Sequence, residues 1–473
     1  MSSTSKAMQR ILALLDDNSF VEIGAKVTAR ATDFNLKPAQ TPSDGVITGY
    51  GVINGSLVCV YSQNAEVLGG SVGEMHARKI AGLYDLAIKT GAPVIGLIDS
   101  TGLRLQEASD ALNAFATVYA QMAKASGVIP QITAVFGNCG GGLALIPGLT
   151  DFTFMAENAK LFVNAPNALA DNREDKNDTA SAAAKAASGM IDGIGSEEEV
   201  LEKVRALAAL LPSNNEDEAA DECDDELNRS CDDLAASAGD PALVLSMIGD
   251  YGEFVETKKD YAKEMVTAFT KLNGITVGIV ANRTVLYNDE AEAVEKFDAA
   301  LTTGGCYKAA DFVKFCDAFS IPVISLANAA GFAATESEER KIADAAGKLT
   351  FAFAHATTVK VGVVTGSAMG SAYAVMNAKG LGADLTFAFP DAKIGMMDAG
   401  MAAKILAAGK GADEVAETAK KYDELQNSIE SAAARGYIDQ IVEPADLRRY
   451  LIGAMEVLYT KREDRPSKKH GTK

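Results

Sequence analysis

The stretch "ITAVFGNCGGGLALIPG", residues 132–148, places three consecutive glycines between two apolar segments. The first apolar segment is typical of a buried strand, and the segment after Gly140, Gly141 and Gly142 is typical of a helical turn. Glycine loses more conformational freedom on folding than any other residue. A run of three glycines therefore indicates a place where the backbone has to be bare.

This glycine turn is compatible with a structural or a functional interpretation. A phosphate-binding P-loop requires Lys and then Ser or Thr directly after the last glycine, and Leu143 stands there instead. The dinucleotide-binding spacing GxGxxG is also missing. One remaining interpretation is a tight strand-to-helix turn with close packing. The other is a pair of bare backbone N–H groups at the positive end of a helix, which can form an oxyanion hole without any side chain.

The same turn occurs twice, because the chain contains an internal repeat of half-chain length. In "APVIGLIDSTG" and "IPVISLANAAG", Pro93 corresponds to Pro322, 229 residues later. The turn repeats at that spacing, as "GNCGGGLAL" from Gly137 and "GSAMGSAYAV" from Gly366. Further matches follow in the same order: Asp151 with Asp384, Lys160 with Lys393, and "FVE" at Phe20 and Phe254. The chain is therefore predicted to be two copies of one domain.

Each copy has the pattern of an α/β domain. The pairs Asn54-Gly55 and Asn273-Gly274 lie between β-rich segments and predict two-residue hairpin turns. An amphipathic helix such as "GEMHARKIAGLYDLAIKTG" follows, and then a buried strand such as "PVIGLID". Short buried strands that alternate with helices predict parallel sheet. We expect domains at residues 1–211 and 242–473.

The segment between the copies, residues 212–241, is rich in acids and poor in large apolar side chains, which predicts a solvated linker. Before it, Ser196 and Glu199 predict a capping box at a helix start. The first 17 residues predict a capped amphipathic helix rather than a signal peptide.

The composition excludes several classes of function. A formal charge of −20 argues against non-specific binding to nucleic acid, whose phosphates require clustered Lys and Arg. No apolar run approaches the ~20 residues that span a bilayer. The six cysteines form no CxxC pair and only three histidines exist, so we expect no metal site and a reduced, cytoplasmic protein.

A second glycine motif, "GGSVG" at residues 69–73, matches the nucleophile elbow GxSxG. The simpler interpretation makes Ser71 a helix N-cap and Glu74 its capping-box partner. His76 lies about one turn along that helix, which leaves His355 as the only candidate base. His355 itself is expected to pack on an apolar helix face. We therefore favour the helix start.

Many motifs together resemble the carboxyltransferase subunits of biotin-dependent acyl-CoA carboxylases and sodium-pumping decarboxylases. This family includes the propionyl-CoA carboxylase beta and methylmalonyl-CoA decarboxylase alpha subunits. The resemblance runs along most of the chain, in "GVITGYGVING", "GGSVGEMHARKI", "GAPVIGLIDSTGLRLQEASDAL", "ASGVIPQITAVFGNCGGG", "LTDFTFM", "FVKFCDAFSIPVIS", "GSAYAVM", "AARGYIDQIVEP" and "KREDRPSKKHG". It implies an α/β fold of two tandem crotonase-like domains.

The resemblance also implies the chemistry of the two turns. Carboxybiotin on a separate carrier exchanges its carboxyl group with the α-carbon of an acyl-CoA enolate. Gly141 and Gly142 are expected to hold the enolate oxygen in an acyl-CoA domain, and Ser371 and Ala372 the biotin ureido oxygen in a biotin domain. Gly370 and Ala374 are expected to contact the cofactor.

The chain departs from the family at several positions that bear on substrate choice. The second turn of the family usually reads "GGAYD", whereas Ser371 and Ala374 replace its second Gly and its Asp here. The first half has Thr101 and Leu103 in "DSTGLRLQE", and the family's "DVPGFLPG" becomes "NAAGFAAT" at residues 328–335. The family's "TGEE" region is degenerate, as "DNREDKNDTASAAAKAASG".

The expected protein is a cytoplasmic subunit of a carboxylase or decarboxylase, peripheral to a membrane only through a partner. The resemblance implies a hexamer in which first and second halves of different subunits meet. Expected partners are a biotin carrier protein and either a biotin carboxylase subunit or a membrane decarboxylase subunit. Two alternatives stay open: a crotonase-type hydratase or hydrolase, and a divergent scaffold subunit.

Overall fold

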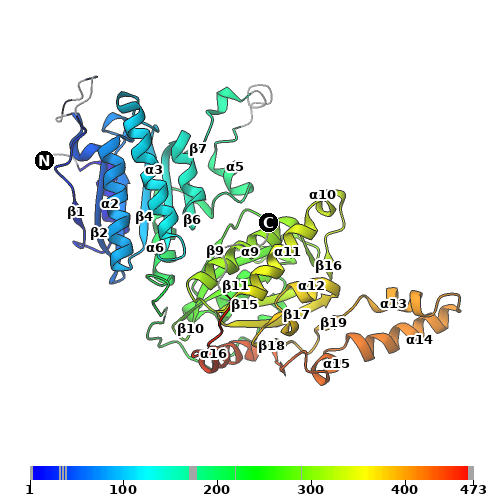
Figure 1. Cartoon of the computed structure of the whole chain (residues 1–473). Helices are drawn as coiled ribbons and strands as arrows, with labels where there is room; N and C mark the ends of the chain where they lie inside the picture. Colours follow the sequence, from blue (N-terminus) through cyan, green and yellow to red (C-terminus); the bar gives the residue numbers. More distant parts are fainter. Residues whose placement is uncertain are drawn as a thin grey trace. The chain divides into compact units, whose positions relative to one another are not determined.

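The computed structural model describes residues 4–30, 34, 37, 40–169, 178–218, 220–288 and 290–466. The chain divides into two compact units, one made of Met1–Ala219 with Lys258–Tyr261 and the other of Ala220–Thr257 with Ala262–Lys473. Each unit is built on an eight-stranded mixed sheet (Figure 1). Residues 171–177 of the degenerate stretch and 467–473 of the closing motif lie outside the described residues.

The first sheet has the strand order β1-β2-β3-β4-β5-β6-β8, and β7 pairs with the end of β5. An antiparallel edge, β1 to β3, leads into a parallel series from β3 onward. The strands are β1 Val21–Ile23, β2 Val46–Ile53, β3 Ser56–Gln63, β4 Val94–Ser100, β5 Gln131–Gly140, β6 Phe152–Ala156, β7 Lys160–Phe162 and β8 Gly193–Gly195.

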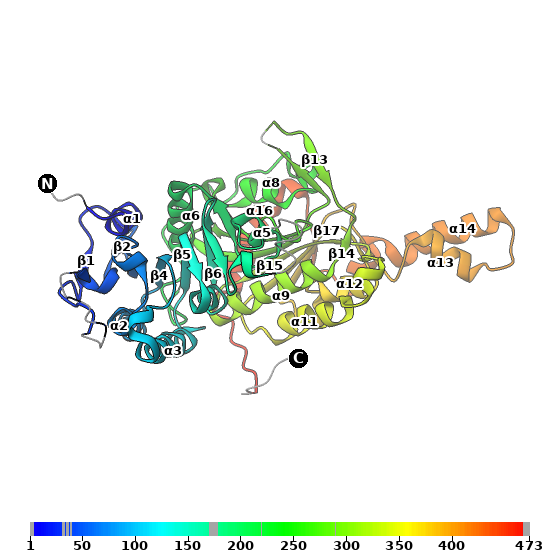
Figure 2. The ribbon, with the colours of Figure 1, turned by 90° about the horizontal axis from the view of Figure 1, so that it is seen from above.

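Helices cover both faces of this sheet, α2 and α3 on one face and α1 and α6 on the other (Figure 2). The α-helices are α1 Lys6–Leu14, α2 Glu74–Thr90, α3 Ala108–Ala125, α5 Ala182–Ala187 and α6 Glu197–Leu210. Short 3-10 turns are η2 Pro42–Gly45, η3 Leu68–Gly70, η4 Leu105–Glu107, η5 Gly141–Gly148 and η6 Pro166–Ala168.

The second sheet repeats this order strand for strand, as β9-β10-β11-β15-β17-β18-β20, with β19 beside the end of β17. The predicted duplication is therefore a duplication of sheet topology. The strands are β9 Phe254–Thr257, β10 Met265–Leu272, β11 Ile275–Asn282, β12 Val285–Tyr287, β13 Ala293–Lys296, β14 Ala300–Leu301, β15 Val323–Ala329, β16 Gly331–Phe332, β17 Lys360–Met369, β18 Leu385–Ala388, β19 Lys393–Gly395 and β20 Gln440–Ile441.

The second unit also carries a helical arm, α13 and α14, that extends away from its sheet (Figures 1 and 2). The α-helices are α7 Leu234–Ser237, α8 Pro241–Ile248, α9 Thr303–Ala318, α10 Glu336–Glu339, α11 Ile342–His355, α12 Gly370–Val375, α13 Ala399–Leu406, α14 Ala412–Tyr422, α15 Ile429–Ala434 and α16 Leu447–Leu458. Short turns are η7 Asp250–Gly252, η8 Lys379–Leu381 and η10 Pro444–Asp446, and a π-helical turn, η9, spans Asp423–Asn427.

Both predicted hairpins are present. Asn54 and Gly55 form a two-residue turn with φ of 49° and 82°, and Ile53 pairs with Ser56 across it. Asn273 and Gly274 do the same with φ of 50° and 77°. Positive φ at both positions is the type I′ turn, whose twist matches that of the paired strands.

The predicted helix starts are partly confirmed. Ser196 and Glu199 form the reciprocal capping box of α6. The predicted capping by Ser71 is wrong, because α2 begins after Gly73 and the Glu107 carboxylate accepts from the Glu74 N–H at 2.6 Å. An acid 33 residues away thus takes the place of the local serine.

The predicted solvated linker, residues 212–241, is also corrected. From Ala220 onward the segment belongs to the second unit, where Cys231 and Leu234 lie in the hydrophobic core. The Arg229 side chain donates to the carbonyls of Met247 and Gly249. A few apolar residues within an acidic composition are enough to anchor the segment. Within the described residues, no helix combines the length and apolar character needed to cross a bilayer.

Candidate active site

The two glycine turns occupy equivalent places in the two sheets. Strand β5 ends at Gly140 and its helical turn begins at Gly141, while β17 ends at Met369 and α12 begins at Gly370. Gly141 has φ +63° and Gly370 has φ +58°. Glycine adopts this left-handed region without steric penalty, so both turns need a glycine at their first position.

The residue after each of these glycines is exposed and the next one is buried. Gly142 and Ser371 lie at the surface, whereas Leu143 and Ala372 are buried. The first N–H groups of a helix have no partner within it and sit at the positive end of its dipole. The backbone of each turn can therefore donate to an anionic oxygen that approaches from outside.

The first turn is open on its outer side and closely packed beneath. A Cβ atom placed on Gly141 would meet nothing within 4 Å. One placed on Gly140 would lie 2.8 Å from the Phe162 ring, and one on Gly142 would lie 2.9 Å from Tyr119 Oη. The Tyr119 hydroxyl donates to the Gly142 carbonyl at 2.5 Å. Close packing and a bare outer backbone, the two interpretations drawn from the sequence, are thus both present here.

The second turn is flanked by the segment that leads into the helical arm. A Cβ atom placed on Gly370 would lie 3.3 Å from the Met396 carbonyl oxygen. Strand β19 pairs with the last residues of β17, Ser367 to Met369. The buried Asn427 side chain donates to the Met397 carbonyl at 3.1 Å and holds this flanking segment in place.

A duplicated polar contact lies under each turn. In the first sheet, Asp99 N–H donates to Gln63 Oε1 at 3.3 Å, and in the second, Asn328 N–H donates to Asn282 Oδ1 at 3.0 Å. The side chains of Asp99 and Asn328 each lie against the glycine that opens the repeated motif. A Cβ atom would come within 2.0 Å of Asp99 at Gly137 and 2.5 Å of Asn328 at Gly366. Asp99 and Asn328 are related by the 229-residue spacing of the repeat, and this correspondence in the sequence could have predicted the contact.

A buried ionic cluster supports the loop that follows β4 and lies near the first turn. Arg104 Nη1 lies 2.5 Å from Asp44 Oδ1 and 2.8 Å from Glu107 Oε1, and all three side chains are fully buried. Arg104 also donates to the Ser71 carbonyl at 2.8 Å. This loop passes close to the glycine turn, because a Cβ atom on Gly102 would lie 3.4 Å from the Gly140 oxygen. The sequence analysis did not identify Arg104 as a functional or structural residue.

The nucleophile-elbow interpretation of "GGSVG" is not supported by the geometry. Ser71 Oγ is buried and accepts from Arg104 Nε at 3.3 Å. The His76 ring bonds the Asp44 carbonyl at 2.9 Å and the Gln63 side chain at 3.2 Å. Burial and the Arg104 charge lower the pKa of His76 to about 3. His355, the other candidate base, stacks on Phe351 in the second unit, with ring centroids 5.1 Å apart.

Ionisable side chains beside the first turn stay protonated at neutral pH. Burial raises the pKa of the Cys139 thiol to about 12 and that of the Tyr119 hydroxyl also to about 12. A thiol is nucleophilic only as the thiolate, so Cys139 is inert, and Tyr119 acts as a hydrogen-bond donor. The chemically active part of the turn is its backbone.

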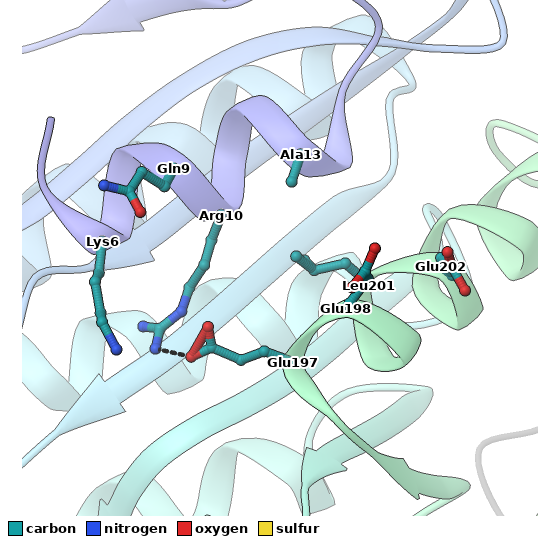
Figure 3. Close-up of a pocket in the computed structure, with 8 residues that line it drawn as sticks. All are labelled: Lys6, Gln9, Arg10, Ala13, Glu197, Glu198, Leu201 and Glu202. Carbon is teal, nitrogen blue, oxygen red and sulfur yellow. Dashed lines mark hydrogen bonds and ion pairs between the residues drawn. The ribbon is translucent and has the colours of Figure 1, made fainter.

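A surface groove of about 410 Å³ lies elsewhere in the first unit, between α1 and α6 (Figure 3). Its walls carry Lys6 and Arg10 on one side and Glu197, Glu198 and Glu202 on the other, and Arg10 pairs with Glu197. No lining residue belongs to a glycine turn. The groove is therefore separate from the candidate site.

The structure places the residues predicted from the sequence in the two turns, each turn within its own unit. Gly141 and Gly142 form the first turn, and Gly370, Ser371 and Ala372 form the second, with Ala374 exposed on α12. At the 229-residue spacing Gly142 corresponds to Ser371. The pair predicted in the second turn, Ser371 and Ala372, therefore begins one residue later than the pair Gly141 and Gly142 in the first turn. The profile of the carboxyl transferase domain matches residues 4–472, and the chain belongs to that family.

Individual relatives agree along nearly the whole chain. The methylmalonyl-CoA decarboxylase subunit alpha of Veillonella parvula is 35% identical, with 98% of this chain and 92% of that protein covered. The propionyl-CoA carboxylase beta chain of Roseobacter denitrificans is 35% identical with the same coverage. The solved transcarboxylase 12S hexamer, with methylmalonyl-CoA bound, is 34% identical with a TM-score of 0.90, covering 98% and 92% of the two chains. The predicted fold, family and carboxyl-transfer activity are confirmed.

Proposed function

We propose that this chain transfers a carboxyl group between biotin on a separate carrier protein and the α-carbon of a short acyl-CoA. The observation that carries the proposal is the duplicated turn, in which β5 and β17 are each followed by a glycine of positive φ and then by an exposed residue. The reaction develops negative charge on two oxygens, and each turn offers backbone N–H groups to one of them.

In this proposal the first turn, through the N–H groups of Gly141 and Gly142, holds the thioester enolate oxygen. The second turn, through Ser371 and Ala372, holds the ureido oxygen of biotin, with Gly370 and Ala374 beside it. Ser371 stands where the family usually has glycine. Serine keeps its backbone N–H group, so the hydrogen-bond donor at this position is preserved. Preorganised donors of this kind typically contribute about 100- to 1000-fold each to the rate.

The surroundings of each turn leave room for these groups. Apart from its chain neighbours, no described residue comes within 4 Å of a Cβ placed on Gly141, which supports close approach of a thioester. The exposed Ser371 supports approach of a planar ring system from solvent. Biotin would accept the carboxyl group from the acyl-CoA or, as carboxybiotin, would supply it, while the chain's own residues orient the reacting groups and stabilise charge.

The proposed active site forms between the first half of one copy and the second half of another, in a hexamer. Exposed apolar residues in the loop and helix that follow β4 and on α13 support this arrangement. In the first unit Leu103, Leu105 and Leu112 are 41%, 84% and 61% exposed, and in the second unit Met401, Ile405 and Leu406 are 60%, 65% and 64% exposed. Proposed partners are a biotin carrier and either a biotin carboxylase subunit or a membrane decarboxylase subunit. The proposed location is the cytoplasm, with membrane contact only through such a partner.

The test uses purified chain, free biotin or a biotinylated carrier, and malonyl-, methylmalonyl- and glutaconyl-CoA. We expect carboxyl transfer that depends on biotin with at least one of these substrates. Hydrolysis without biotin would instead indicate a crotonase-type hydrolase. Acyl-CoA binding without any turnover would indicate a scaffold subunit, and either result would overturn the proposal.

A further inference from the structure

Tyr119, which projects from α3, contacts the first glycine turn. Its hydroxyl donates to the Gly142 carbonyl at 2.5 Å. Phe115, one helical turn earlier, packs edge-on against the Tyr119 ring with centroids 5.0 Å apart. Phe115 is buried, so it fixes the tyrosine ring from below. The hydroxyl therefore reaches the turn from a rigid support.

The hydrogen bond from Tyr119 acts on a run of three glycines, Gly140 to Gly142. Three consecutive glycines have no side chains that could hold their peptide planes. A hydrogen bond to the Gly142 carbonyl fixes the peptide plane between Gly142 and Leu143, and with it the direction in which the turn faces. Preorganised donors accelerate a reaction because they need no reorganisation when charge develops.

In the second unit, the residue equivalent to Tyr119 makes a different contact. At the 229-residue spacing, Tyr119 corresponds to Lys348, which pairs with Asp344 Oδ2 at 3.1 Å and lies over the Tyr307 ring. The second turn has only one glycine at its centre, Gly370, and is the start of a regular helix. It thus needs less external support than the first.

We propose that Tyr119 is a positioning residue: its hydroxyl tethers the Gly142 carbonyl and thereby limits rotation of the Gly142 backbone, which carries one of the two N–H groups proposed to bind the enolate oxygen. This inference rests on the proposed function of the turn. It predicts an effect on turnover rather than on substrate binding, because the tether is made by the turn itself and not by the bound acyl-CoA.

The experiment compares Tyr119→Phe with the unmodified chain in carboxyl transfer from methylmalonyl-CoA to free biotin. Loss of one neutral hydrogen bond predicts a fall in kcat of about tenfold. KM for the acyl-CoA should change by less than about twofold, because ground-state binding is not affected. Tyr307→Phe is the matched control, since Tyr307 donates to Asp344 on the surface of the second unit at 2.6 Å, and it should leave kcat unchanged.

A double-mutant cycle with Gly142→Ala tests the contact independently of activity. The added Cβ would lie 2.9 Å from Tyr119 Oη but 3.5 Å from the next atom, Phe115 Cε1. Gly142→Ala should therefore lower the unfolding midpoint of the unmodified chain more than that of the Tyr119→Phe variant. The proposed role of Tyr119 would be overturned if the midpoint changes of Gly142→Ala and Tyr119→Phe simply add in the double variant. An unchanged kcat in Tyr119→Phe would also overturn it. If the unmodified chain transfers no carboxyl group, the proposed function fails, and the unfolding cycle still decides the tether.

Discussion

Gly141 and Gly370 are counterparts: Gly141 is the first residue after β5 and Gly370 the first after β17, with φ of +63° and +58°. Their surroundings differ, because a Cβ atom would enter open space at Gly141 but lie 3.3 Å from the Met396 oxygen at Gly370. Both turns are thus built on the same backbone conformation but differ in their tolerance of a side chain.

This difference predicts unequal costs for alanine at the two positions. Gly141→Ala should destabilise its unit by about 1 kcal/mol, the usual penalty of left-handed backbone for a residue with a side chain. Gly370→Ala should cost more, since the Met396 segment must also move. Thermal unfolding of both variants measures the difference, and equal midpoints would contradict it. Gly347→Ala, with open space around its Cβ and no positive φ, is the control.

The backbone donor at position 371 can be removed without changing any neighbour. Ser371→Gly should keep carboxyl transfer close to its original rate, because the N–H group remains. Ser371→Pro should lower kcat by about 100-fold or more, because proline has no N–H group. The comparison with Ala372→Pro shows whether the donors are Ser371 and Ala372 or Gly370 and Ser371. Full activity in both proline variants would remove the second turn from the mechanism.

The buried cluster around Arg104 is expected to be sensitive to loss of its cation. Arg104→Met leaves the buried carboxylates of Asp44 and Glu107 without their cation, which typically costs about 3–5 kcal/mol. Urea unfolding should show this loss, together with weaker acyl-CoA binding, because the loop beside the first turn loses its support. Arg340→Met is the control, since its pair with Glu336 is exposed. A loss below about 1 kcal/mol, as found for exposed pairs, would show that the cluster is dispensable.

Asp151 should make stability depend on pH. Burial raises the pKa of its carboxyl to about 7, against an ordinary value of 3.8, and the charge of Asp192 acts in the same direction. The folded state therefore binds a proton between about pH 4 and 7 that the unfolded state has released, so this residue's contribution to stability falls as pH rises through that window.

The measurement is the difference in unfolding midpoint between Asp151→Asn and the unmodified chain, taken at pH 5 and pH 8. The unfolding midpoint of Asp151→Asn relative to the unmodified chain should be higher at pH 8 than at pH 5. The reason is that asparagine carries no charge, whereas the buried aspartate becomes ionised. The counterpart Asp384 faces Lys461 Nζ at 2.9 Å, so Asp384→Asn is the matched control and should destabilise at both values. A difference for Asp151→Asn that does not change with pH would contradict the raised pKa.

The helical arm is expected to carry the contact between copies. Ile405→Asp together with Leu406→Asp should reduce the molar mass in solution, because charged side chains cannot be buried without partners. Light scattering measures the mass, and carboxyl transfer should fall in parallel if the site needs two copies. Glu417→Lys on α14, an exposed change outside the apolar face, is the control. An unchanged mass would exclude the arm from the interface.

The sequence by itself determined the duplication, the two hairpins and the place of both turns. These features are encoded locally: Asn-Gly pairs select their turn type, and glycine is needed where φ is positive. The capping box at Ser196 and Glu199 is equally local, since its two residues lie on one helical turn.

Only the tertiary structure decided the contacts that join distant residues. Glu107 rather than Ser71 caps α2, Cys231 and Leu234 anchor an acidic segment in the second core, and Tyr119 reaches the carbonyl of Gly142. Periodicity and spacing report which face of an element is apolar, but they do not report which side chain from another element meets it. The bare backbone was therefore predictable from the sequence, whereas the side chains that hold it in position were not.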